Sequence, residues 1–233
     1  IYTDVDAIFT VDPKVYHDAK KLDRITYDEM MELASTGASI LETRSVELAK
    51  KYNVKLYIGK SLEGDKRKGT YVMNESIYIE EMPVTGISIS DDCSIYSLRG
   101  MENDGTAVAK LFQLLADLHI NVNMISKQTY GENKCTVSFS CTDEQAKDLD
   151  KALEENELFR EVAVEKQSNL SILSLVGVGM ATATGVASKV FSILAKEGIM
   201  YYQITTSEIS ISVTVKRDDK IKAVIALCEA FGL

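Results

Sequence analysis

The chain has 233 residues, 45% hydrophobic and 26% charged, so it can bury the cores of one or two globular domains. Its formal net charge of -9 disfavours polyanions, and we expect no nucleic-acid partner. No apolar run approaches the roughly 20 residues that span a bilayer, and the N-terminus lacks a signal-peptide layout. We therefore expect no membrane partner and a cytoplasmic location.

The cysteines and histidines predict no metal site. No CxxC spacing occurs, and neither histidine has a Cys or His neighbour at ligand spacing. We expect reduced, partly buried thiols, and the helical pattern before His119 predicts that this residue ends a helix. The four thiols belong to Cys93, Cys135, Cys141 and Cys228.

The first eighty residues open on the acidic segment IYTDVDAIFTVDP and then show mixed helix and strand patterns. Thr26 and Glu29 form a capping box, with Ile25 and Met30 at the positions of a hydrophobic staple, so a helix is predicted from residue 27. A second helix is predicted within residues 39–53. Short strands are predicted at 54–59 and 70–73, the basic residues 66–68 are interpreted as a solvated loop, and a boundary is expected near 74–82.

An internal repeat follows. The segment SIYSLRG at 94–100 matches SILSLVG at 171–177, and Phe112 matches Phe191, with an offset that moves from 77 to 79. Each copy has the order strand, helix, strand, strand, helix, which is typical of a ferredoxin-like fold. In the first copy the expected elements are 94–100, 105–118, 121–128, 134–140, 143–156 and a closing strand at 159–166.

The second copy ends after its second helix and lacks a closing strand, whereas the alternating segment VTGISIS at 84–90 has no partner of its own. We therefore expect residues 84–90 to complete the second module, which makes the first module an insertion within it. Pairing of 84–90 inside the first module would contradict this.

Both modules contain a strand-to-helix turn whose backbone N–H groups suit a small carboxylate. The alternative is that Gly105 and Gly185 only permit the turn. A dinucleotide site is disfavoured because Thr182 stands where the third fingerprint glycine would be. The first turn is the more polar: Glu102 and Asp104 can pair with an ammonium group. Asn123 and Gln128, on the next predicted strand, are expected to face the same turn.

No P-loop, GxSxG or HExxH motif is present, and residues 84–233 do not bring a general base, a nucleophile and an oxyanion site together. The two modules are therefore interpreted as a small-molecule sensor. No catalytic residue and no metal ligand is assigned.

These residues resemble a known family. The repeated βαββαβ module with a ligand turn resembles the ACT domain, and the segments ITTSEISISVTV and CEAFGL are similar to the regulatory half of aspartokinases. The segments YTDVDAIFTVDPK and DRITYDEMMELASTGASIL resemble motifs of the kinase domain of the same family. The resemblance covers the whole chain.

The resemblance implies a fold and a domain organisation. The fold class is α/β (α+β): a C-terminal part of an amino-acid-kinase α/β domain followed by two ferredoxin-like ACT modules, one inserted in the other. The implied domains are residues 1–80 for the kinase part, 94–168 for the first ACT domain, and 84–90 with 169–233 for the second.

The resemblance also implies an activity and its ligands. The activity is transfer of the ATP γ-phosphoryl group, with Mg2+, to the β-carboxylate of L-aspartate, under feedback inhibition by lysine or, second, threonine. It further implies a homodimer through the ACT domains. The runner-up is a non-catalytic amino-acid-binding subunit that acts on a separate kinase chain.

The implied site residues fall into two sets. The nucleotide side consists of Thr3, Asp4, Phe9 and Lys14. The effector side consists of Met101, Asn103, Asp104, Gly105, Thr106, Ala107, Val122, Asn123 and Gln128.

The sequence departs from the family at several positions. Ser39 replaces a lysine, Glu42-Thr43-Arg44 replaces His-Pro-Arg, and the N-terminal phosphate- and aspartate-binding motifs have no counterpart. We therefore expect the chain by itself to be inactive. In the ACT turn the glycine is shifted by one position, and Asn123 replaces an aspartate.

Overall fold

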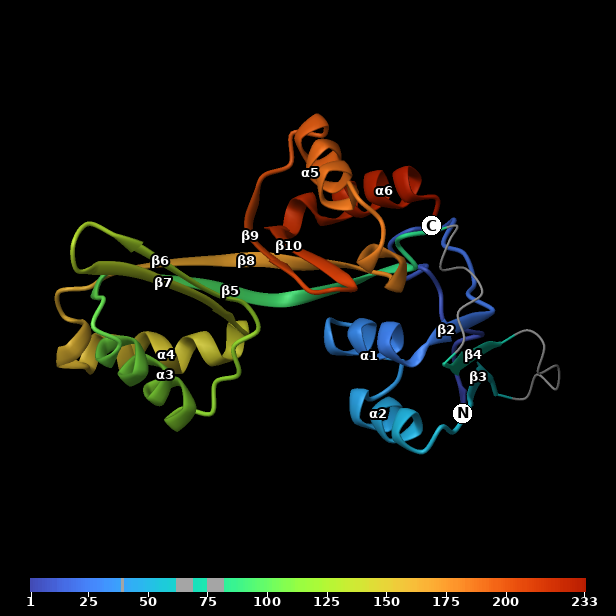
Figure 1. Ribbon diagram of the computed structural model, residues 1–233, viewed down its shortest axis with the longest axis horizontal. Coiled ribbons are helices and arrows are strands. Elements are labelled where there is room, and N and C mark those ends of the chain that lie inside the picture. The colour runs from blue at the N-terminus through green and yellow to red at the C-terminus, as the bar shows by residue number, and fades with distance from the viewer. Residues whose placement is uncertain (39, 62–68, 75–81) are drawn as a thin grey trace. The chain divides into compact units, whose positions relative to one another are not determined.

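The computed structural model describes residues 1–38, 40–61, 69–74 and 82–233. They form two compact units, which are described separately: unit 1 contains residues 1–90 and 172–233, and unit 2 contains residues 91–171. Two long strands, β5 (Gly86–Glu102) and β8 (Ala163–Val176), contribute residues to both units (Figure 1).

The kinase-like part of unit 1 contains a four-stranded mixed sheet with the order β1-β3-β4-β2. The pairs β1–β3 and β2–β4 are parallel, and β3–β4 is antiparallel. The elements are β1 (Tyr2–Thr3), β2 (Arg24–Thr26), α1 (Tyr27–Ser35), α2 (Thr43–Lys51), β3 (Leu56–Lys60) and β4 (Thr70–Met73). Apolar side chains of both helices and three of the strands form one core. The order helix, helix, strand, strand predicted for residues 27–73 is confirmed.

Helix α1 begins where the capping box predicts. The Thr26 hydroxyl accepts a hydrogen bond from the Glu29 N–H, and the Glu29 carboxylate accepts one from the Thr26 N–H. Ile25 and Met30, the two staple positions, are both buried in the core of this part. The local sequence therefore specifies where this helix begins.

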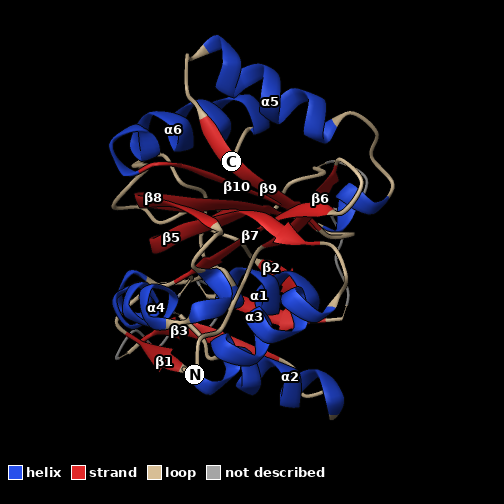
Figure 2. Cartoon of the chain, turned by 90° about the vertical axis from the view of Figure 1, so that its left-hand side faces the viewer, coloured by secondary structure: helices blue, strands red, loops and turns tan. Residues whose placement is uncertain are grey.

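The second part of unit 1 contains residues 84–90 and 172–233. Its strand order is β5-β8-β10-β9, with β9 at the edge, and α5 and α6 cover one face of β9 and β10 (Figure 2). Val190, Leu194, Val213 and Leu227 are among the fully buried residues between helices and sheet. The further elements are the 3-10 turn η3 (Val178–Ala181), α5 (Val186–Lys196), β9 (Tyr201–Thr206), β10 (Ser210–Lys216), the 3-10 turn η4 (Arg217–Asp219) and α6 (Lys220–Phe231).

The two parts of unit 1 share their cores. Val11 from the kinase-like part is buried among the residues of α5, α6 and β10, and Val176 at the end of β8 is buried in the kinase-like core. The backbone N–H of Ile87 donates to the Thr10 carbonyl, so β5 is also bonded directly to the first segment of the chain. Removing either part would therefore expose apolar surface of the other.

Unit 2 has the strand order β6-β7-β5-β8, the same arrangement as the second part of unit 1. Helices α3 and α4 lie side by side along one side of these strands (Figure 1). The core between these helices and the strands contains fully buried Tyr96, Leu111, Phe139 and Leu149. The elements are the second half of β5, α3 (Thr106–Asp117), β6 (Ile125–Tyr130), β7 (Lys134–Cys141), α4 (Asp143–Glu155), the 3-10 turn η2 (Glu157–Phe159) and the first half of β8.

Three strand predictions need correction. Residues 84–90 and 94–100 belong to one continuous strand, β5, and the closing strand joins residues 171–176 in β8. The predicted strand 121–128 begins only at Ile125, because residues 121–124 form an irregular connection after α3. The closing strand begins at Ala163 instead of 159, since Phe159 lies in η2. Neither long strand contains a proline, and Gly100 is the only glycine within them after Gly86, so nothing local marks a break.

Several smaller predictions can be compared with the structure. All four cysteines are buried and none forms a disulfide, and Cys135 and Cys141 lie six residues apart on β7. His119 follows the end of α3 with a positive φ of 55°. Ser39, the basic residues 66–68 and most of the expected boundary at 74–82 lie outside the described residues.

Two features are absent from the described ranges. No helix there is long and apolar enough to cross a membrane. Within the same ranges, no group of three His, Cys, Asp or Glu side chains is arranged to hold a metal ion.

Candidate functional site

The turn between β5 and α3 is the first feature of the candidate site. A β-bulge between Arg99 and Met101 shifts the register of β5 against β7 just before the turn. Gly105 then adopts a left-handed conformation (φ 79°, ψ −26°) at the N-cap of α3. Residues with a Cβ atom are strained in the left-handed conformation, which explains why a glycine occupies this position.

Asp104 caps α3 from the position before Gly105. Its Oδ1 atom accepts hydrogen bonds from the backbone N–H groups of Thr106 (2.9 Å) and Ala107 (3.1 Å). Two of the N–H groups expected to face a ligand carboxylate are therefore bonded to the protein itself. Asp104 thus stabilises the helix end, and its second carboxylate oxygen is what a ligand can approach.

The corresponding turn of the second module differs. Gly185 is also left-handed (φ 88°, ψ 0°) at the N-cap of α5, and no side chain within the described ranges caps that helix. The sequence places an alanine, Ala183, and a threonine, Thr184, before Gly185, whereas the first turn has Asn103 and Asp104 before Gly105. The two copies therefore share the backbone turn but differ in charge at the helix end.

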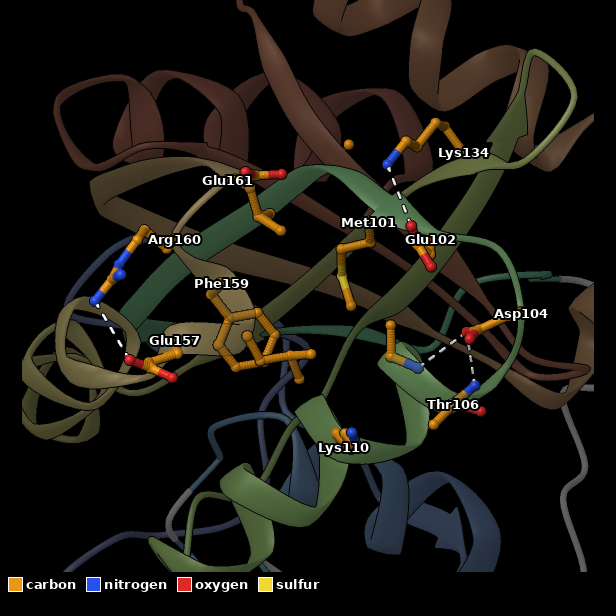
Figure 3. Close-up of a pocket in the computed structure, with 14 residues that line it drawn as sticks. Met101, Glu102, Asp104, Thr106, Lys110, Lys134, Glu157, Phe159, Arg160 and Glu161 are labelled. Carbon is orange, nitrogen blue, oxygen red and sulfur yellow. Dashed lines mark hydrogen bonds and ion pairs between the residues drawn. The ribbon is translucent and has the colours of Figure 1, made fainter.

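A cavity of about 620 Å3 lies at the first turn, inside unit 2. The end of β5, the first turn of α3, the start of β7 and the segment between α4 and β8 form its walls (Figure 3). Buried Met101 and Phe159 supply apolar surface to it. The lining residues are Gly100, Met101, Glu102, Asp104, Thr106, Ala107, Lys110, Lys134 and residues 157–162.

Charges of both signs surround this cavity. Lys134 pairs with Glu102 at 3.9 Å and Arg160 with Glu157 at 3.7 Å, and all four side chains are more than half exposed. Figure 3 shows the Arg160–Glu157 pair beyond Phe159 and the Lys134–Glu102 pair near Met101. Exposed pairs at these distances contribute little to stability, so they can exchange partners with a ligand at small cost. A ligand that carries both an ammonium and a carboxylate group fits this distribution of charge.

The structure separates Asn123 from the turn. Its backbone N–H faces the Ser140 carbonyl (3.4 Å), whereas Glu102 at the turn pairs with Lys134. Ser140 and Lys134 are six residues apart on β7, which corresponds to about 20 Å. Asn123 therefore does not reach the cavity of its own module.

Gln128 and Val122 also lie away from the cavity. Gln128 is exposed on β6 opposite Thr136 of β7, and β7 stands between β6 and β5. Val122 is half-buried against the core of unit 2. Of the effector residues predicted from the sequence, Met101, Asp104, Thr106 and Ala107 line the cavity, and Gly105 and Asn103 shape the turn.

The sequence reasoning missed residues 157–162, Lys110 and Lys134. Residues 157–162 stand at a predicted helix end and strand start, where no motif indicates a ligand contact. Lys110 follows Thr106 by four residues, and this helical spacing would have placed both on one face of α3. Lys134 could be found only from the pairing of β5 with β7.

The nucleotide-side residues of the sequence analysis lie at the beginning of unit 1. Thr3 is in β1, and its hydroxyl donates to the Asp4 carboxylate at 2.8 Å. This hydrogen bond, one from the Asp4 backbone and the charge of Lys14 lower the pKa of Asp4 below its ordinary value, although desolvation opposes them. Lys14 is exposed, and its backbone N–H donates a hydrogen bond to the Asp12 carboxylate.

Two further lysines lie beside these residues. The Lys21 ammonium stands 5.9 Å from the centre of the Phe9 ring, and it pairs with Asp6 at 3.7 Å. Lys60 pairs with the same carboxylate at 3.5 Å. A half-buried ring with Lys21 over it, and Lys60 sharing the Asp6 carboxylate with Lys21, is compatible with a base and phosphates, so the residues present fit a nucleotide. Lys21 and Lys60 were not predicted, because only the Phe9–Lys21 bridge and the β1–β3 pairing bring them to this place.

The fold and the two sites define a class of protein: an amino-acid-kinase domain region joined to an ACT regulatory region. The protein-family model for the amino acid kinase family matches residues 1–60, and the ACT domain model matches residues 173–231. Aspartokinase 2 of Bacillus subtilis is 39% identical over the whole of this chain, which covers 57% of that protein. The chain belongs to the aspartokinase family.

Solved structures of the same family share the fold. Aspartokinase III of E. coli, in complex with lysine and aspartate, aligns with 99% of this chain and 51% of its own, with a TM-score of 0.72 and 26% identity. The regulatory subunit of aspartate kinase from Thermus thermophilus aligns with 64% of this chain and 99% of its own, with a TM-score of 0.58 and 30% identity. The chain spans about 57% of the length of the Bacillus relative.

Proposed function

We propose that the chain is part of an enzyme that transfers the γ-phosphoryl group of ATP, with Mg2+, to the β-carboxylate of L-aspartate. Membership of the aspartokinase family supports this reaction. The cluster of Thr3, Asp4, Phe9 and Lys14, with Lys21 beside them, supplies groups that suit a nucleotide. By itself the chain is expected to consume no ATP in an aspartate-dependent way.

We propose further that unit 2 binds an end-product amino acid, lysine first and threonine second, and that this binding inhibits the kinase. The single observation that carries this proposal is the 620 Å3 cavity at the β5–α3 turn, whose lining contains both carboxylates and cations. Glu102, Asp104 and Glu161 suit two ammonium groups, as in lysine. Lys110, Lys134 and Arg160 suit its carboxylate. The E. coli relative described above was solved with lysine.

Calorimetric titration of the chain with L-lysine and L-threonine tests the effector proposal. Lysine is expected to bind, and Asp104→Asn is expected to weaken this binding because it removes a negative charge but keeps an oxygen that caps α3. Asp117→Asn, at the far end of the same helix, is the matched control and should leave binding unchanged. Absence of heat with both amino acids would contradict the proposal.

The proposed domains are the kinase part at 1–80, one ACT domain at 94–168, and a second built from 84–90 and 169–233. A homodimer through the ACT region is proposed because β6 is an edge strand whose six residues are all exposed, including Ile125 (52%) and Tyr130 (43%). Sedimentation should give a dimer mass, and Ile125→Lys should reduce it to that of a monomer. A monomer at micromolar concentration would refute the dimer.

A second candidate function is a non-catalytic regulatory subunit that acts on a separate kinase chain. One observation favours it: this chain covers 99% of the Thermus thermophilus protein, which is described as a regulatory subunit. Adding the chain to a kinase that lacks its own regulatory region would separate the two functions. Lysine-dependent inhibition in that mixture is expected only of a subunit that acts in trans. A cytoplasmic location is proposed for either function, because four buried cysteines outside disulfides suit a reducing compartment.

A further inference from the structure

Glu29 is a buried carboxylate that joins three segments of the chain. Glu29 is only 1% exposed. Its Oε2 atom accepts hydrogen bonds from the N–H (3.0 Å) and the hydroxyl (2.7 Å) of Thr26. Its Oε1 atom accepts from the Thr85 hydroxyl (2.6 Å) and the Val178 N–H (3.1 Å). All four donors are neutral, so the negative charge is stabilised by hydrogen bonds and by the N-terminus of α1.

The two oxygen atoms of this carboxylate have different hydrogen-bond partners. The Oε2 atom completes the capping box of α1 and needs only the local sequence. The Oε1 atom is bonded to Thr85, which immediately precedes β5, and to Val178, which follows the end of β8 by two residues. Glu29 therefore holds the unit 1 ends of both strands that continue into unit 2.

The other ends of the same two strands line the effector cavity. Met101 and Glu102 are the last residues of β5, and Val162 directly precedes β8. A change at the cavity thus acts on segments that are covalently continuous with the residues bonded to Glu29.

The packing around Glu29 is tight. A Cβ atom added to Gly177 would lie 2.3 Å from the Pro83 carbonyl oxygen and 2.9 Å from the Thr85 nitrogen. The Thr85 N–H donates to the Val176 carbonyl, so the two strand ends are also bonded to one another. Because even a methyl group at Gly177 would overlap these backbone atoms, the two strand ends have little room to move independently and are expected to shift together.

The same strand start also reaches the nucleotide side. The N–H of Ile87 in β5 donates to the Thr10 carbonyl at 2.7 Å, and Thr10 follows Phe9 directly. The beginning of β5 is therefore held by α1 through Glu29 and by the nucleotide-side segment through Thr10.

We propose that Glu29 is a positioning residue that transmits effector binding from the strands β5 and β8 to α1 and the nucleotide-side segment. The inference rests on the proposed function, because it requires an amino acid to bind in unit 2. It goes further in naming the contact through which the regulatory region acts on the kinase region.

Thr85→Val is the decisive variant, since it removes only the bond across to β5. The variant keeps the shape of the side chain, and the capping box of α1 remains complete. Thr85→Ser restores a hydroxyl and serves as the rescue. Asp28→Asn is the matched control, because Asp28 lies in the same helical turn as Glu29 but pairs with Lys50.

The measurement is hydrogen–deuterium exchange of the 233-residue chain with and without L-lysine or L-threonine, together with calorimetry of each variant. In the unaltered chain, bound amino acid is expected to change the exchange rate of residues 24–36 by at least about fivefold, the lower end of usual coupling between sites. Thr85→Val should lose this response while residues 100–107 still respond. Thr85→Ser and Asp28→Asn should keep it.

Three results would overturn the inference, and they are distinguishable. If an amino acid binds and residues 24–36 do not respond in the unaltered chain, the coupling does not exist. If Thr85→Val exchanges faster throughout but keeps the ligand response, the contact serves stability alone. If calorimetry detects neither amino acid, the proposed function fails and the inference fails with it.

Discussion

Replacing Asp104 by alanine should weaken the start of α3 by a measurable amount. The substitution removes the acceptor of two backbone hydrogen bonds, at 2.9 and 3.1 Å, to Thr106 and Ala107. Loss of a capping side chain costs about 1 kcal/mol, with a range of about 0.5 to 2. Losing about 1 kcal/mol corresponds to a factor of about five in the equilibrium between the closed and opened helix end.

Amide exchange of Thr106 and Ala107, followed by NMR, measures this factor directly. Asp104→Asn is the matched control, because it keeps an acceptor oxygen and loses only the interaction of the charge with the helix dipole, about 0.3 kcal/mol at an exposed site. We expect exchange of both amides to accelerate about fivefold in Asp104→Ala and less than twofold in Asp104→Asn. Equal rates in both variants and the unaltered chain would refute the assignment of Asp104 as the helix cap.

Three further results are expected. Gly177→Ala should destabilise unit 1 by about 1–3 kcal/mol in urea denaturation, because the new Cβ meets the Pro83 carbonyl oxygen at 2.3 Å; unchanged stability would refute this close approach. Burial raises the pKa of Asp150, but hydrogen bonds from Lys166 and Tyr96 outweigh this and leave the pKa below its ordinary value. The stability that the ionised Asp150 contributes is therefore present above the ordinary pKa and is lost as pH falls through the lowered pKa. An Asp150→Asn variant whose stability differs equally from that of the unaltered chain at pH 3 and pH 6 would contradict this. Burial raises the pKa of Cys228 to about 12 and of Cys141 to about 11, so neither thiol should react with a disulfide reagent at pH 8 before unfolding; fast reaction of either in the native chain would count against its burial.

The repeat and the capping signals allowed much of the fold to be predicted. The capping box at Thr26 and Glu29 fixes the start of α1 because its bonds join residues three apart, which any folded context preserves. The repeat gave the element order of both modules, since a strand, a glycine turn and an amphipathic helix each have a local pattern. The strand limits were less accurate: pairing partners extend β5 and β8 beyond the segments whose alternation is visible in the sequence.

The candidate site was predicted only in part. Asp104, Thr106 and Ala107 were found because a polar turn before a helix is a local signal. Asn123 was expected at the same turn, but it pairs with the end of β7 that lies about 20 Å from the turn. Strand register depends on contacts between strands, so no single segment of the sequence specifies it. Arg160 and Lys134 line the cavity without any motif of their own.

The sequence by itself determined the family, the repeated element order and the starts of α1, α3 and α4 to within one residue, because these depend on residues close together in the chain. Only the tertiary structure decided what Asp104 and Glu29 do. Asp104 already bonds two N–H groups that a ligand was expected to use, and Glu29 bonds Thr85 and Val178, which are 56 and 149 residues away in sequence. A carboxylate in the sequence offers up to four acceptor sites, and only the folded chain specifies which donors occupy them.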